Sequence, residues 1–522
     1  MSSRPWDRYW LVAGFAALML APATWGAVLA LVAGVASIAW RVHGFVALRR
    51  SAASVNPRSA AVLGTDPRGR TVGLTERELS AHGLILGASG AGKSTTLLRI
   101  LTEQIARGQP VVAIDMKGSP AFARVLGEAA RAAGRPFSVW SIDGPAHWNP
   151  LQHGNATELK DKLMATERFT EPHYQRAAER YVQTVLQVLS AAHPGRAPVL
   201  SEVVQLMDPG RLPSVLRELD RDLRDRVRDY LAGLTPDQLS AVRGLQTRLA
   251  VLTESHTAPY LAPGPRLADA TIDLREALHG PQVVLFSLNS ARYGRLAAQL
   301  GTLVVQDLVS ASGERLSDAA TSGRRGMATI AIDEFSALGA DHVIALLSRG
   351  RESGLSVLVA TQELADLDRA APGLRDQVVG VTALKIIHRQ EVPNSARTIA
   401  LMVGTERIWE QTRQTAAGVL GGYDTGRGTR REVERFIVHP NEIQSLATGE
   451  AIVISKLGGQ GVRRVRVDPP RTVESSPAVP QPPTIESPPR LDRPRRTMPS
   501  RAPASARLPE ARDRPGPDSL GR

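Results

Sequence analysis

Cysteine is absent from the 522-residue chain. Without thiolates, the sequence excludes a disulfide framework, a cysteine nucleophile, iron–sulfur ligation and cysteine-based zinc sites. Lysine is also scarce: only six of the 64 basic residues are lysines, and the rest are arginines, a bias more typical of GC-rich coding sequences than of one function. His147 and His153 flank a Trp-Asn-Pro turn without acidic or further histidine neighbours, so we expect no zinc site.

Neither basic nor acidic residues are concentrated enough along the chain to identify a binding partner. The formal net charge is +13 and hydrophobic residues make up 43%, which excludes a wholly disordered chain and a polytopic transporter. Residues 1–60 contribute +5 and residues 467–522 contribute +3, so the long segment between them is only mildly basic. Such a balance does not by itself predict nucleic-acid binding, which must be argued from motifs.

The first fifty residues contain a long uncharged segment. No charged residue occurs from 9 to 40, and arginines flank the segment on both sides. Pro22 and Gly26 interrupt it near the middle, so we expect a membrane anchor of two short transmembrane helices within residues 1–50, with both ends in the cytoplasm. A single long tilted helix is the alternative. The Ala-Pro-Ala sequence at 21–23 also matches a signal-peptidase site, but a second apolar stretch follows directly, which makes secretion the weaker interpretation.

The last segment, residues 467–522, holds 14 of the 36 prolines, with serine, arginine and glutamate between them. It has almost no aromatic or β-branched residues, so it cannot bury enough apolar surface to offset the entropy of ordering. We therefore predict a disordered Pro/Arg-rich tail.

A glycine-rich loop follows a short apolar run at 82–86 and precedes a helix-prone stretch at 95–107. In this strand–loop–helix context the P-loop pattern Gly-x4-Gly-Lys-Ser binds phosphate, because glycines let backbone N–H groups point at the phosphates and the helix N-terminus adds its positive dipole end. Lys93 is expected to reach the β- and γ-phosphates and Ser94 to ligate Mg²⁺. The predicted ATP-binding residues are Gly87, Ala88, Ser89, Gly90, Ala91, Gly92, Lys93, Ser94 and Thr95.

Two acids follow a second apolar run. Residues 327–332 are typical of a fully buried strand, and Asp333 and Glu334 come directly after it, at the edge where ligands bind in open α/β sheets. Asp333 is expected to hold Mg²⁺ through water, and Glu334 to polarise the attacking water. Paired acids after a strand could instead cap the next helix. Their combination with an intact phosphate loop favours catalysis and predicts an ATPase domain in the cytoplasm, anchored to the inner membrane by more than one span.

The 240 residues between Lys93 and Asp333 exceed a compact nucleotide-binding core, so an insertion must separate its strands. Amphipathic helical patterns fill residues 155–275, at 174–192, 200–207, 213–219, 225–234 and 236–255. Strand-like runs lie outside this segment, at 111–115, 137–142, 282–288, 356–360, 381–388 and 451–455. The sequence therefore predicts an α/β fold in which the core, residues 51–154 and 276–466, carries an inserted all-α domain.

Further short motifs occur together in one order. They are Ile-Asp-Met-Lys-Gly at 114–118, Trp-Asn-Pro-Leu at 148–151, Gly-Arg-Glu-Ser-Gly-Leu at 350–355, Ala-Thr-Gln at 360–362, Val-His-Pro-Asn-Glu at 438–442 and Leu-Ala-Thr-Gly-Glu-Ala at 446–451. With the phosphate loop, the two acids and the membrane anchor, this set resembles the coupling proteins of conjugation and type IV secretion, of the TraD/TraG type. The resemblance covers about residues 5–460 and leaves out the tail.

The resemblance implies a RecA-like P-loop ATPase that forms a membrane-anchored hexamer. Such a ring would deliver a relaxase-bound DNA strand, protein substrates or both to the proteins of a secretion channel. It also implies that Gln362 senses the γ-phosphate and that Arg351 is an arginine finger acting on a neighbouring subunit's nucleotide. An ordinary surface arginine is the weaker alternative for Arg351. Asp115 and Lys117 match a family motif, either as site residues or as a structural turn.

Two other functions compete with delivery to a secretion channel. A double-stranded DNA translocase of the FtsK/HerA kind shares the motor core, but FtsK-type pumps usually end in a winged-helix module, and this chain ends in the Pro/Arg-rich tail. A nucleotide-switched membrane adaptor without significant turnover belongs to a different class, and the intact set of Lys93, Ser94, Asp333 and Glu334 argues against it. The cargo, the preference for single- or double-stranded DNA and the number of subunits stay open.

Overall fold

The computed structural model describes residues 59–470, with short gaps at 168, 267–268, 323–325, 339, 419–420 and 458–460. The expected membrane anchor within residues 1–50 lies outside the described residues, as does the predicted tail of residues 467–522 beyond residue 470. The start of that predicted tail is wrong by one residue, because Val467 belongs to a strand of the core sheet, Val462–Val467. Within the described part of the chain, no helix combines the length and the apolar composition needed to cross a bilayer.

Eleven strands form one mixed sheet in the order β2-β1-β15-β14-β11-β3-β10-β9-β4-β8-β5. The parallel part consists of seven neighbouring strands: β11 (Leu384–Ile387), β3 (Gly83–Leu86), β10 (Leu355–Thr361), β9 (Ala328–Asp333), β4 (Val111–Asp115), β8 (Val283–Ser287) and β5 (Phe137–Ser141). Strand β10 separates β3, which precedes the phosphate loop, from β9, which ends at the acids. A side chain just after β10 therefore lies between the loop and the acids.

The central strands are continuous apolar runs because both faces of the sheet are covered. One apolar layer packs α4 (Lys93–Ala106) and α5 (Pro120–Ala132) against one face. The second layer packs α13 (Ser290–Ser322), α14 (Ala340–Gly350) and the inserted helices against the other. This arrangement buries β3, β4, β9 and β10 throughout, so polar groups reach solvent only where the strands end.

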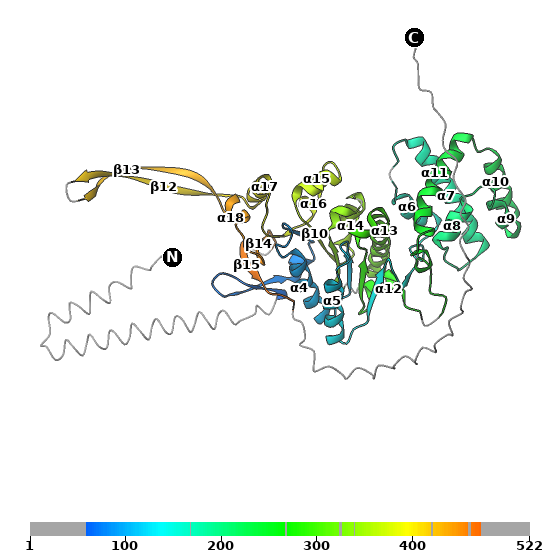
Figure 1. Ribbon diagram of the computed structural model, residues 1–522, viewed down its shortest axis with the longest axis horizontal. Helices are drawn as coiled ribbons and strands as arrows, with labels where there is room; N and C mark the ends of the chain where they lie inside the picture. Colours follow the sequence, from blue (N-terminus) through cyan, green and yellow to red (C-terminus); the bar gives the residue numbers. More distant parts are fainter. Residues whose placement is uncertain are drawn as a thin grey trace, which may run out of the picture. The chain divides into compact units, whose positions relative to one another are not determined.

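The inserted segment is helical, and its helices lie close to the expected positions (Figure 1). They are α6 (Ala156–Met164), α7 (Pro172–Ala192), α8 (Leu200–Leu206), α9 (Leu212–Val215), η1 (Leu216–Glu218), α10 (Arg221–Ala232), α11 (Pro236–Thr253) and η2 (Ala258–Tyr260). The short strands β6 (His147–Trp148) and β7 (Thr271–Ile272) pair where the chain enters and leaves the insert. A buried ion pair fastens it to the core, because the Lys162 ammonium lies 2.7 Å from the carboxylate of Asp307 in α13.

Four antiparallel strands extend the sheet beyond β11, and most of them were not expected from the sequence. They are β14 (Glu450–Ser455), β15 (Val462–Val467), β1 (Ser59–Thr65) and β2 (Thr71–Thr75). Only β14 coincides with a predicted run. The short helices α3 (Glu76–Leu79), α12 (Leu274–His279), η3 (Phe335–Ala337) and α15 (Leu364–Ala370) complete the core.

The expected strand at 381–388 is wrong in its first part. Residues up to Val381 belong to helix α16 (Leu374–Val381), and the strand β11 starts only at Leu384. Gly373, in the left-handed conformation at φ 75°, begins this helix, and Leu374 and Val378 are buried one helical turn apart. The β-branched residues of this segment suggested a strand. Packing of Leu374 and Val378 against the core instead stabilises a helix.

A long two-stranded ribbon interrupts the core between β11 and β14. Helix α17 (Pro393–Val403) leads into β12 (Thr405–Gly418), which pairs with β13 (Gly421–Phe436) alone, and α18 (Pro440–Gln444) leads back to the sheet (Figure 1). Trp409 is 58% exposed on this ribbon, with the Arg430 guanidinium 4.6 Å from the centre of its ring. We call the whole segment from Arg389 to Gly449 the ribbon segment.

Candidate active site

The phosphate loop connects β3 to α4 and depends on its glycines. Gly90 and Gly92 have φ of 72° and 118°, a region that side chains other than glycine rarely adopt. A Cβ atom on Gly87 would lie 2.6 Å from the Cβ of His388. The loop therefore has no room for a larger side chain at Gly87, and its backbone conformation favours glycine at 90 and 92.

Lys93 folds back onto this loop. Its side chain is buried, and its ammonium donates hydrogen bonds to the carbonyl oxygens of Gly87 at 2.5 Å and Ala88 at 3.2 Å. Burial lowers the pKa of Lys93 below its ordinary value, and the positive charge of Lys117 lowers it further. The loop thus holds its own cation against the carbonyl oxygens at its start.

Both ends of the ribbon segment contact the phosphate loop. The N–H of Ala88 donates to the carbonyl of Arg389 at 2.8 Å, and the N–H of Gly449 donates to the carbonyl of Ala91 at 3.0 Å. Gly449 has φ of 82°, which explains the glycine in the Leu-Ala-Thr-Gly-Glu-Ala motif. The loop is therefore supported by residues more than 290 positions further along the chain.

His388 supports the same region with its side chain, and sequence reasoning missed it. It is fully buried, its Nε2 lies 2.9 Å from the hydroxyl of Thr96, and its Nδ1 lies 2.9 Å from the carbonyl oxygen of Glu450. Burial lowers the pKa of His388 to about 4, so the ring is neutral at pH 7. No motif in the sequence marks it, because His388 reaches the phosphate loop only through the pairing of the preceding strand β11 with β3, whose carboxyl ends share one edge of the sheet.

Ser94 and Asp333 meet although 239 residues separate them. The Ser94 hydroxyl donates a hydrogen bond of 2.7 Å to Oδ2 of Asp333. Asp333 is 1% exposed, and within the described residues its Oδ1 has no hydrogen-bond partner. A hydroxyl beside a buried carboxylate with an unsatisfied oxygen is a suitable donor set for Mg²⁺, which prefers oxygen ligands and keeps several waters. The residues present therefore fit a magnesium ion.

Glu334 is held from two sides. It has φ of 60° and ψ of 45°, an uncommon backbone conformation for a residue that is not glycine. Gln362, directly after β10, donates from Nε2 to its Oε1 at 2.6 Å, and the Lys117 ammonium lies 2.9 Å from its Oε2. A cavity of about 510 Å³ opens here, lined by Glu334, Ser336, Gln362, Asp366, Arg369 and Ala370. The structure thus brings together the four predicted residues Lys93, Ser94, Asp333 and Glu334 with Gln362.

The sequence left open whether Asp115 and Lys117 are site residues or form a structural turn. The two residues differ in this respect. The Asp115 carboxylate accepts hydrogen bonds from the N–H groups of Lys117 at 2.9 Å and Ser119 at 2.6 Å, so it closes a turn. Burial raises the pKa of Asp115 against the effect of these bonds. Lys117 instead reaches the acids, and, although burial opposes its charge, Asp333 and Glu334 raise its pKa. Lys117 is missing from the predicted site residues, yet it follows strand β4, which lies beside β9 with Asp115 opposite Asp333.

Arg351 lies apart from this cluster. It is exposed in the turn between α14 and β10 and so precedes the amino end of β10, whereas the phosphate loop follows the carboxyl end of β3. The two strands are parallel, with Leu358 opposite Gly83. Arg351 therefore lies at the edge of the sheet opposite to the phosphate loop of its own chain.

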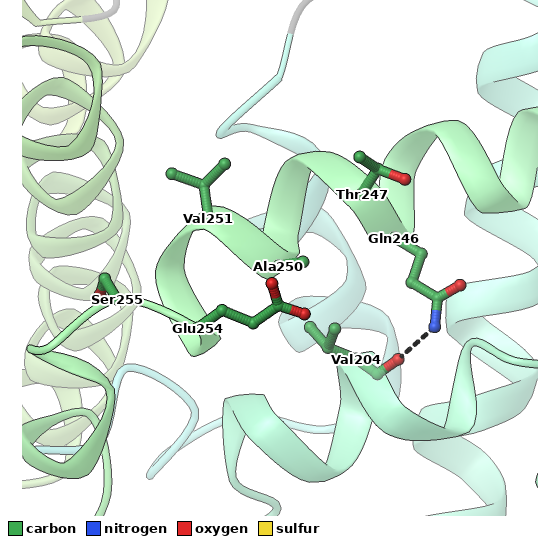
Figure 2. A pocket seen from close by; sticks show the side chains of 7 residues that line it. All are labelled: Val204, Gln246, Thr247, Ala250, Val251, Glu254 and Ser255. Atoms are coloured by element: carbon green, nitrogen blue, oxygen red, sulfur yellow. Dashed lines mark hydrogen bonds between the residues drawn. The ribbon is translucent and has the colours of Figure 1, made fainter. Parts of the chain in front are cut away.

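A second pocket lies within the inserted helices and contains none of the predicted site residues (Figure 2). Its volume is about 560 Å³, and its lining includes Val204 of α8 and Gln246 of α11, whose amide donates to the Val204 carbonyl at 3.0 Å. The exposed side of Val251 forms part of its rim. It offers no charged group other than Glu254, so it does not compete with the phosphate loop as a nucleotide site.

Comparison with known families gives two partial matches. Residues 328–448 match the family model described as the TraM recognition site of TraD and TraG, and residues 61–133 match the HerA-like helicase carboxyl-terminal model. Among curated proteins, no sequence matches the chain significantly.

Solved structures share the fold at low identity. The unbound conjugative coupling protein TrwBdeltaN70 is 15% identical, with a TM-score of 0.59 over 82% of this chain and 93% of that chain. TrwB with the ATP analogue ADPNP is 16% identical, with a TM-score of 0.55 over the same shares. VirB4 of Thermoanaerobacter pseudethanolicus is 14% identical, with a TM-score of 0.52 over 80% of this chain and 98% of that chain. The fold is therefore an α/β fold with a large mixed sheet, like that of the conjugative coupling protein TrwB, and the chain's resemblance to TraD/TraG-type coupling proteins is confirmed.

Proposed function

We propose that this chain is a membrane-anchored ATPase, assembled as a hexamer, that couples ATP hydrolysis to the delivery of relaxase-bound DNA, protein substrates or both to a type IV secretion or conjugation channel. One observation carries the ATPase part: the Ser94 hydroxyl and the Asp333 carboxylate lie 2.7 Å apart, with Glu334 and Gln362 beside them. The TraD/TraG match over residues 328–448 and the TrwB-like fold support the delivery part.

ATP would bind with its phosphates on the loop from Gly87 to Gly92. The backbone N–H groups and the positive end of α4 favour the phosphate oxygens. The Lys93 ammonium would leave the carbonyl oxygens of Gly87 and Ala88 and bind the β- and γ-phosphates instead. Ser94 and Asp333 would hold Mg²⁺, as TrwB has been solved with ADP and Mg²⁺. When bound, this ion neutralises charge on the β- and γ-phosphates.

Glu334 is the residue that would orient the attacking water. Its carboxylate borders the 510 Å³ cavity, and Gln362 fixes one of its oxygens, so the pair can place a water in line with the γ-phosphate. Arg351 cannot contribute within its own chain, because it lies at the opposite edge of the sheet. As an arginine finger it would act on the nucleotide of a neighbouring subunit in the ring.

The test is ATP turnover by the full chain in lipid nanodiscs with single-stranded DNA, with duplex DNA and without DNA. We expect turnover that single-stranded DNA stimulates, and none in a matched Lys93→Ala variant, since the loss of this cation removes a charge-assisted contact to the transferring phosphoryl group. Turnover by Lys93→Ala equal to that of the wild type would refute the ATPase assignment. No turnover under any condition would favour a nucleotide-switched adaptor.

The HerA-like match over residues 61–133 supports a second candidate, a double-stranded DNA translocase. The same measurement separates the two functions. The translocase would be favoured over the coupling ATPase if duplex DNA stimulated ATP turnover well above single-stranded DNA. Movement of the protein along duplex DNA, measured in a strand-displacement assay, would support the same conclusion.

A further inference from the structure

Lys117 occupies a position between the two acids. Its ammonium lies 2.9 Å from Oε2 of Glu334 and 3.5 Å from Oδ2 of Asp333. The second oxygen is the one that accepts the Ser94 hydroxyl hydrogen bond, so the lysine and the serine approach the same atom of Asp333. The lysine charge therefore lies next to the place assigned to Mg²⁺.

The turn that carries Lys117 is rigid. Asp115 accepts the N–H groups of Lys117 and Ser119, and Gly118 has φ of 66° and packs so closely on Asn289 that a Cβ would lie 2.6 Å from the Cβ of that residue. The backbone thus holds the lysine beside the acids, while its side chain keeps 41% of its surface exposed and can leave.

Within the described residues, no other lysine or arginine forms an ion pair with Asp333 or Glu334. Lys93, the other cation of the site, directs its ammonium at the carbonyls of Gly87 and Ala88. Two adjacent carboxylates repel each other and attract any cation that reaches them. Within the part of the chain that the structure describes, Lys117 is therefore the cation that is ion-paired with both carboxylates.

We propose that Lys117 is the resting counter-ion of Asp333 and Glu334 and withholds both acids from divalent metal until nucleotide arrives. A metal ion alone would meet a like charge beside Asp333, whereas Mg²⁺ bound to ATP brings phosphate charges that offset this repulsion and attract the lysine away. Lys117 is then a positioning residue that makes metal entry depend on nucleotide. This inference rests on the proposed function in assigning Mg²⁺ to Ser94 and Asp333.

The experiment uses the full chain and Mn²⁺ alone, without nucleotide, followed by electron paramagnetic resonance of the free ion. Lys117→Met removes the charge and keeps most of the side chain. We expect it to bind Mn²⁺ at least tenfold more tightly than the wild type. Lys117→Arg, which keeps the charge, and Lys160→Met, a matched change on α6, should both behave as the wild type. Adding Asp333→Asn to Lys117→Met should abolish the gain.

Equal Mn²⁺ affinity of Lys117→Met and the wild type would overturn the proposal, as would an equal gain in Lys117→Arg. If Lys117→Met does not fold, Lys117→Gln supplies the same test with a polar neutral side chain. Thermal unfolding gives an independent readout: Mg²⁺ alone should raise the melting temperature of the neutral variants and leave that of the wild type unchanged. None of these measurements uses turnover, so an inactive protein would refute the proposed function without deciding the role of Lys117.

Discussion

The two hydrogen bonds of His388 can be separated by substitution. The Glu450 carbonyl can only accept, so the neutral ring donates from Nδ1 to it and accepts the Thr96 hydroxyl at Nε2. His388→Asn keeps a donor near the Nδ1 position and loses the bond to Thr96. His388→Gln keeps an acceptor near the Nε2 position and loses the bond to Glu450. Thr96→Val removes the hydroxyl with little change of shape.

The magnitude follows from burial. His388 and Thr96 are both 0% exposed, so the loss of one partner leaves the other unsatisfied, at a cost of about 1–3 kcal/mol. Thr96 belongs to the first turn of α4, and the His388 side chain packs against Gly87 with its Cβ and against Gly92 with its ring, so the cost falls on the conformation of the phosphate loop. With 1.4 kcal/mol for each factor of ten, ATP binding should weaken about 5- to 150-fold.

The assay is titration of each variant with a fluorescent ATP analogue, arranged as a double-mutant cycle. Thr96→Val should weaken binding as much in the His388→Gln background as in the wild type. It should have almost no further effect in the His388→Asn background, because that variant has already lost the bond. If Thr96→Val weakened ATP binding as much in the His388→Asn background as in the wild type, the hydrogen bond between His388 and Thr96 would make no contribution to binding, and the reasoning would be refuted.

Three other predictions concern single residues. Glu334→Gln should keep nucleotide binding and stop hydrolysis, because an amide fits the site and no longer orients water as a carboxylate does; loss of ATP binding in an equilibrium titration would instead make Glu334 a structural residue. Arg351→Ala subunits mixed with Lys93→Ala subunits should recover part of the turnover that each lacks alone; no recovery, with wild-type subunits shown to exchange, would exclude action in trans. Burial lowers the pKa of His82 to about 4. The neutral ring therefore makes its full contribution to the free energy of unfolding above pH 6.5, and this contribution is lost as the pH falls towards 4. His82→Asn, which suits the φ of 60° and keeps an acceptor for the Val357 N–H, should flatten the fall of melting temperature between pH 6.5 and 4, and an unchanged slope would contradict this.

The sequence predicted the parts of the site that short motifs encode. The glycine pattern implies the phosphate loop because only glycine tolerates the positive φ at 90 and 92, and the acids after a buried run imply their place at the carboxyl edge. Local patterns also predicted the inserted helices, because the helical repeat of apolar residues is visible within one segment.

The rest could not be predicted because it depends on which strands become neighbours. The family resemblance already placed Gln362 in the site, but its bond to Glu334 depends on the position of β10 between β3 and β9. The contact of Lys117 with Glu334 likewise depends on the position of β4 beside β9. His388 carries no recognisable motif, and its role arises only from the pairing of β11 with β3. Strands β2 and β15 are short and only partly buried, so their pairing with the sheet is a tertiary effect.

The ribbon segment leaves the phosphate loop at Ala88 and returns to it at Ala91. Its two ends are thus anchored three residues apart on the element that binds nucleotide, and the long ribbon lies between these anchors. By thermodynamic reciprocity, any molecule that binds the ribbon more tightly in one nucleotide state changes the affinity for that nucleotide by the same factor. A ligand of the ribbon that distinguishes nucleotide states in this way would therefore be an effector of nucleotide binding at the loop.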